Sequence, residues 1–155
     1  MKRSTFYPTI GLSLLLVIGE VYGGAVSDRL HISATVAPKI EYRILTEASA
    51  LKITPADLKK GYHDVHMGTF LTITTNDPNG YLLSIQSQRG EGLVSITVTV
   101  EGSAYNLSPT GSVEIPFPFH GLAPEKRKLS YRFHLAPNAK TGIYPWPIIV
   151  TVHPI

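Results

Sequence analysis

The stretch YRFHLAPNAKTGIYPWPIIVTVHPI, residues 131–155, holds two strand patterns on either side of a turn. The first pattern covers residues 129–135 and the second covers residues 148–153, and apolar side chains occupy every second position in both. Such alternation is typical of strands that bury one face and expose the other. Pro137 and Gly142 lie between the two patterns and favour a turn. We therefore expect two antiparallel strands here.

The same alternation extends over most of the chain. It predicts further strands at residues 29–36, 39–45, 65–75, 81–88 and 93–100. The side chains expected to face the core in these strands include Leu30, Ile32, Ala34, Val36, Ile40, Tyr42, Ile44, Val65, Met67, Leu71, Ile73, Leu83, Ile85, Val94, Ile96, Val98 and Val100. Asn79 and Gly80 accept positive φ and predict a turn after residue 75.

One segment is predicted to be helical. In TPADLKKG, residues 54–61, Thr54 can cap, Pro55 suits the first helical position, and Gly61 can close the last turn. Half-buried antiparallel strands with so little helix to cover them must cover each other. The sequence therefore predicts an all-β, immunoglobulin-like antiparallel β-sandwich of about seven to nine strands with one short helix.

The first 25 residues have the pattern of a secretory signal peptide. Lys2 and Arg3 precede an apolar run at residues 10–19, and the small residues Gly23 and Ala25 follow. We expect cleavage after Ala25 and a single sandwich domain over residues 26–155, exported to the periplasm or cell surface with no membrane span after cleavage. The alternative is an uncleaved N-terminal anchor.

Composition excludes several classes of site. The chain has no cysteine, so it forms neither disulfides nor thiolate metal sites. It carries 14 Lys and Arg against 11 Asp and Glu, and the net charge of +3 gives no argument for nucleic acid. The local basic run EKRK at residues 125–128 is interpreted as a solvated turn.

No pattern of catalytic residues is present. The sequence lacks a calcium loop, a nucleophile elbow, a phosphate-binding loop and a dinucleotide fingerprint. His63 and His66 would point to opposite faces of a strand, which argues against a shared metal ion. We expect no cofactor, no metal and no enzymatic activity, although a catalytic triad that assembles only in space stays open.

Three aromatic side chains lie in proline-rich segments. They are Phe119, Tyr144 and Trp146. Exposed rings of this kind can stack on a sugar or anchor a partner. The alternative is that they fill the ends of the sandwich.

The C-terminal stretch resembles the ends of spore coat U-like domains and of archaic chaperone–usher pilus subunits. The shared features are the turn at Pro137 and Gly142, then Tyr144, then the alternating strand of Ile148, Val150 and Val152. Those subunits usually contain a disulfide, which this chain lacks. The resemblance implies a non-catalytic subunit of a surface or pilus-like structure, joined to other subunits, or to a periplasmic chaperone, by β-strand complementation.

The strand at residues 148–153 must pair with a strand of its own chain or of another. We expect residues 129–135 on one side of it. The other edge is expected to receive residues 29–36 from the same molecule or from the next, with Leu30, Ile32, Ala34 and Val36 filling a groove beside Ile148, Val150 and Val152. A secreted carbohydrate- or surface-binding module that uses the three aromatic side chains is the alternative function.

Overall fold

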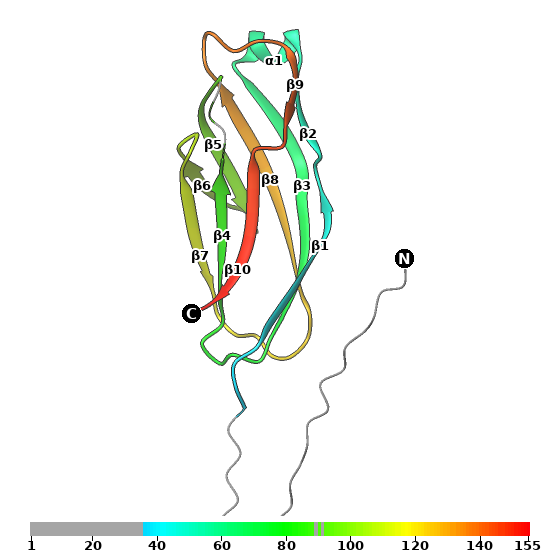
Figure 1. Cartoon of the computed structure of the whole chain (residues 1–155), viewed down its shortest axis with the longest axis vertical. Coiled ribbons are helices and arrows are strands. Elements are labelled where there is room, and N and C mark those ends of the chain that lie inside the picture. The colour runs from blue at the N-terminus through cyan, green and yellow to red at the C-terminus, as the bar shows by residue number, and fades with distance from the viewer. Residues whose placement is uncertain (1–35, 89, 91) are drawn as a thin grey trace, which may run out of the picture. The chain divides into compact units, whose positions relative to one another are not determined.

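The computed structural model describes residues 36–88, 90 and 92–155, which fold into an antiparallel β-sandwich with one short helix (Figure 1). The predicted fold class is confirmed. The predicted leader and most of the predicted strand at residues 29–36 lie outside the described residues. The elements are β1 (Ile40–Glu47), β2 (Ala50–Ile53), α1 (Pro55–Lys60), β3 (Tyr62–Thr75), β4 (Tyr81–Ser87), β5 (Leu93–Val100), β6 (Ser103–Leu107), β7 (Ser112–Phe117), β8 (Glu125–Leu135), β9 (Gly142–Pro145) and β10 (Ile148–Pro154).

The described residues thus contain ten strands, more than the alternation predicted. The strands that it missed are β2, β6, β7 and β9, which are four to six residues long. A segment of that length offers too few alternate positions for a periodic pattern to stand out. No helix of the described chain is long and apolar enough to cross a membrane.

Two sheets form the layers of the sandwich. The larger has the order β1-β3-β8-β5-β6, the smaller has the order β10-β4-β7, and β2 and β9 form a separate two-stranded ribbon. Every pairing is antiparallel. Figure 1 shows the smaller sheet lying over the larger one.

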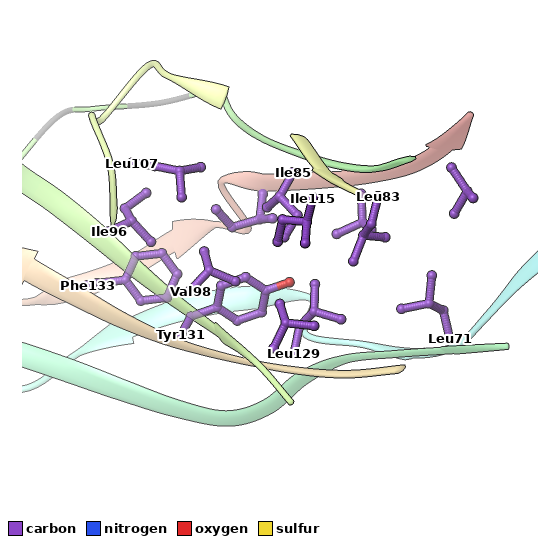
Figure 2. Close-up of a cluster of buried hydrophobic side chains, with 14 of the residues drawn as sticks. Leu71, Leu83, Ile85, Ile96, Val98, Leu107, Ile115, Leu129, Tyr131 and Phe133 are labelled. Atoms are coloured by element: carbon purple, nitrogen blue, oxygen red, sulfur yellow. The ribbon is translucent and has the colours of Figure 1, made fainter. Parts of the chain in front are cut away.

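The core fills the space between these layers, and Figure 2 shows side chains from both meeting there. The labelled members, all buried, are Leu71, Leu83, Ile85, Ile96, Val98, Leu107, Ile115, Leu129, Tyr131 and Phe133. The hydroxyl of Tyr131 is 2.8 Å from Thr69 Oγ1, so its polar end is satisfied inside the core. Burial raises the pKa of Tyr131, which therefore stays neutral.

Four side chains predicted to face the core are exposed. Val36, before β1, is 76% exposed, and Tyr42 of β1 is 41% exposed. Val94 is 58% exposed because a bulge shifts the register of β5 between Leu93 and Ser95. Met67 is 48% exposed and has φ 50° in an irregular part of β3 between Val65 and Thr69. An extra residue in a strand turns its side chain away from the face that simple alternation predicts.

The helix α1 forms as the sequence predicts. Thr54 Oγ1 accepts a hydrogen bond from the Asp57 N–H, and the Thr54 N–H donates to Asp57 Oδ2 at 2.8 Å. This reciprocal pair is a capping box. Gly61, at φ +80°, ends the helix and donates its N–H to the carbonyl oxygens of Asp57 and Leu58.

Removing the cap should weaken the fold by a measurable amount. We expect Thr54→Ala to lower the free energy of unfolding by about 1 kcal/mol, because the Asp57 N–H loses its acceptor. Thr54→Ser retains the hydroxyl and should stay close to the original chain. Urea denaturation of the three proteins checks this, and equal midpoints for the alanine and serine variants would contradict it.

The basic run at residues 125–128 was wrongly predicted to be a solvated turn. It begins β8, and Arg127 points inward and is only 7% exposed. Its guanidinium pairs with Glu101 and Glu125 and lies 4.4 Å from the centre of the Phe117 ring. These partners compensate for the cost of burying a charge. The alternation of β8 therefore continues through charged residues and leaves Lys126 and Lys128 on the outer face.

Candidate functional site

Strand β10 lies at one edge of the smaller sheet. It pairs with β4, and Val150 lies opposite Ile85 in the register. The expectation that it pairs with residues 129–135 was wrong. Between them, residues 142–145 form β9, which pairs with β2 instead of making a hairpin with β8. Pro145 and Pro147 lack N–H donors and interrupt the ladder where the chain passes from β9 to β10.

The second edge of β10 carries main-chain groups that point away from the described sheet. The N–H of Gln88 donates to the carbonyl oxygen of Pro147 at 2.9 Å, so residue 147 directs its carbonyl toward β4. Alternate residues of a strand direct their N–H and C=O groups to opposite sides. Ile148, Val150 and Val152 therefore direct theirs away from β4, and no strand of the described chain pairs with that edge.

Over its first six residues, β10 lacks the charges and prolines that normally prevent strands from adding to a sheet, and Pro154 only ends it. The seven residues of β10 include no Lys, Arg, Asp or Glu. The opposite edge strand of the same sheet, β7, carries Glu114 and Pro116 within six residues. Charges and prolines on an edge discourage further pairing. The edge of β10 is therefore the more receptive of the two.

The core is incompletely covered next to β10. Ile40, Tyr42 and Ile44 of β1 lie opposite Thr75, Ile73 and Leu71 of β3, so they face the same side of the sheet. The three β3 residues are buried, but Ile40 and Ile44 are only half-buried and Tyr42 is 41% exposed. Parts of β1 and β10 approach each other with Cα atoms within 8 Å. Apolar side chains of β1 thus remain partly accessible on the core side of the larger sheet.

The strand order locates these side chains within the immunoglobulin-like arrangement. In a constant-type domain, strands A, B, E and D form one sheet and strands C, F and G the other. Here β1, β3, β8 and β5 follow the A-B-E-D order, and β10 and β4 correspond to F and C. The position of strand G, beside β10, is taken by no described strand.

The described chain begins at the end of the domain where β10 finishes (Figure 1). Asn76 fixes this part of the chain with three hydrogen bonds. Its main-chain N–H donates to the Lys39 carbonyl oxygen, and its Oδ1 accepts the Lys39 N–H at 2.5 Å. Its Nδ2 donates to the Ala37 carbonyl oxygen. Val36, just before this anchor, is 76% exposed. The other residues predicted to fill the groove, namely Leu30, Ile32 and Ala34, lie outside the described residues. Ile148, Val150 and Val152 line the core side of β10 as expected.

The three predicted aromatic residues do not form one patch. Trp146 stands edge-on to Tyr131 and Phe133, with ring centres 5.3 and 5.6 Å apart. Phe119 lies two residues after Phe117 of β7. Phe117 lies opposite Tyr81 of β4, and Tyr81 lies opposite Pro154, the last residue of β10. The length of β10, roughly 20 Å, therefore separates Phe119 from Trp146.

Tyr144 lies at the same end of the domain as Trp146. Its hydroxyl donates to the carbonyl oxygen of Lys140 at 2.8 Å. The side chain borders an apolar hollow of about 340 Å³ between the β2–β9 ribbon and the start of β5, where Leu51 and Leu93 also contribute. Trp146 is not part of that lining.

His63 and His66 have different neighbours, whereas His66 and His134 border the same hollow. His63 Nδ1 lies 3.1 Å from Asp57 Oδ2. Burial raises the pKa of Asp57, and the hydrogen bonds from Thr54 and His63 more than reverse that effect. His66 lies on the outer face of β3 beside another hollow. The described residues contain no group of three His, Asp or Glu side chains that could hold a metal ion.

No protein-family model, curated protein or solved structure matches this chain. Its function is therefore inferred from the sequence and from the surroundings of β10.

Proposed function

We propose that this protein is a non-catalytic, exported structural subunit of a bacterial surface or pilus-like structure that joins its partners by β-strand complementation. The observation that carries the proposal is the free edge of β10 beside the half-covered side chains of β1. A strand inserted between them would bond to the main chain of Ile148, Val150 and Val152. Its alternate side chains would cover Ile40, Tyr42 and Ile44.

The segment at residues 29–36 has the properties that such a strand needs. Leu30, Ile32, Ala34 and Val36 form one apolar face, and polar residues alternate with them. In the proposed assembly, this segment of one copy fills the groove of the next copy. A periplasmic chaperone would supply a substitute strand until assembly, because an uncovered apolar edge promotes aggregation. The alternative of a glycan site built from Phe119, Tyr144 and Trp146 loses support, since Phe119 lies at the other end of the domain and Trp146 packs against Tyr131 and Phe133.

Deletion of residues 26–37 from the exported protein tests the proposal. We expect the full-length protein to form oligomer ladders that survive detergent and separate on heating. The truncated protein should stay monomeric, have a lower melting temperature, and regain stability when a synthetic peptide of residues 26–37 is added. A truncated protein that is soluble, as stable as the original and indifferent to the peptide would refute strand complementation.

Two control peptides make the test specific for main-chain pairing. One carries N-methyl groups at Leu30, Ile32 and Ala34, and the other carries them at His31, Ser33 and Thr35. Alternate N–H groups point to opposite edges of a strand, so one set faces β10. One peptide should therefore bind much more weakly than the other. Equal binding of both methylated peptides and the original would show that the contact is only hydrophobic.

A further inference from the structure

The outer face of the larger sheet carries a row of cationic and polar side chains along β8. The residues that point outward are Lys126, Lys128, Ser130, Arg132 and His134, in alternation with the buried ones. Successive members lie about 7 Å apart along the strand. No acidic residue interrupts the row.

Neighbouring strands extend this positive surface. Thr72 of β3 pairs with both Lys126 and Arg43 of β1, so the three side chains share one cross-strand row. The Lys128 ammonium lies 5.9 Å from the centre of the Phe70 ring. No carboxylate of the described chain pairs with Arg43, Lys126 or Lys128. Their charges are therefore available to a partner.

The acidic groups on this face are already neutralised. Asp64 accepts two hydrogen bonds from Arg132, at 2.7 and 2.9 Å. The Arg132 guanidinium lowers the pKa of Asp64, so this carboxyl stays charged and paired. Glu41, two residues before Arg43 in β1, pairs with Lys39. The net charge of the outer face is therefore positive.

A hollow of about 510 Å³ adjoins the cationic row, where β3 bulges at Met67. Its lining includes His66, Thr97, Thr99, Ser130 and His134, with the Asp64–Arg132 pair beside them. Ser130 Oγ accepts a hydrogen bond from the Met67 N–H, which leaves the serine proton to donate. Thr97 Oγ1 lies 3.0 Å from His134 Nε2 and donates to Asn106 Oδ1. Donors and acceptors are thus mixed within one hollow.

We propose that this face binds an acidic polysaccharide, with a sugar ring in the hollow and its carboxylates along Lys126, Lys128 and Arg43. Sugar hydroxyls both donate and accept, which matches hydroxyl and imidazole groups better than it matches a phosphate chain or a lipid headgroup. A lysine row alone would suit any polyanion, so the adjoining hollow makes the surface specific for sugar. This inference is independent of strand complementation at β10, because it uses the opposite face of the larger sheet.

Binding of a polyuronic acid chain, compared with that of polyphosphate, tests the inference. We expect the full-length protein to bind polyuronate more tightly than polyphosphate at equal ionic strength. Lys126→Gln with Lys128→Gln should weaken polyuronate binding about tenfold and lower the slope of log K against log salt by about two, since two fewer counterions are released. Lys52→Gln with Lys140→Gln removes the same charge from exposed lysines elsewhere and should leave binding unchanged.

The hollow is tested by Thr99→Tyr, which fills it with a side chain that suits a half-buried strand position. This variant should lose the preference for polyuronate over polyphosphate while still binding polyanions in general. Equal affinity of the original protein for both polymers, or for anionic lipid vesicles, would overturn the inference. Equal losses of polyuronate affinity in the two lysine double variants would also overturn it. Thermal melting of each variant confirms that it is folded.

Discussion

We expect Val98→Asp to abolish folding of the domain, whereas Thr97→Asp should leave it folded. Val98 is fully buried between the sheets, and an unpaired carboxylate there costs several kcal/mol or must be protonated. The total stability of a domain is only about 5–15 kcal/mol. One substitution at this position therefore removes most of it.

Thr97 is the matched control because it is the next residue of the same strand and faces outward. It lies opposite Arg132 in the register, so an aspartate there has a cation for a neighbour. The hydrogen bonds to Asn106 and His134 are lost, at a cost of about 1 kcal/mol. Thermal melts followed by circular dichroism compare the two variants. Equal melting temperatures would show that the assigned face is incorrect.

Gly80→Ala is expected to be the most damaging glycine substitution among the turns. Gly80 has φ +89°, and a Cβ atom placed there would lie 2.0 Å from the carbonyl oxygen of Phe117. That oxygen belongs to the backbone and cannot move without shifting β7. Conformational strain and overpacking together should lower the free energy of unfolding by about 3–5 kcal/mol.

Gly61→Ala separates these two contributions. Gly61 has a similar φ of +80°, but a Cβ atom there would meet nothing within 4 Å. Its substitution should cost about 1–2 kcal/mol, from conformational strain alone. Urea unfolding of both variants measures the difference between them. If the two costs were the same, the close approach of Phe117 to Gly80 would be wrong.

Much of the sandwich follows from local pattern. Leu83, Ile85, Ile96 and Val98 are buried where alternation predicts, because a strand at a sheet interface has only two faces to choose from. Val94 and Met67 depart from the pattern because bulges depend on the partner strand, which the sequence of one strand does not specify.

The arrangement of the edge was less predictable than the identity of its residues. Alternation correctly gave Ile148, Val150 and Val152 a buried face. It did not predict their neighbour, because the chain crosses between the layers at Pro145 and Pro147 and β10 joins β4. The outward-facing row on β8 was not predicted. Four successive charged residues suggested a solvated turn, because the sequence does not show that Arg127 finds acidic partners inside the fold.

The edge-on packing of Trp146 also makes its intrinsic fluorescence sensitive to the structure of the domain. It is the one tryptophan of the chain, and its ring centre lies 5.3 Å from that of Tyr131. At this separation, light absorbed by Tyr131 is transferred efficiently to Trp146. Separation of the β9–β10 junction from β8 would expose the indole to water and shift its emission to longer wavelength. The emission of the unlabelled protein thus reports when Trp146 loses its contact with β8.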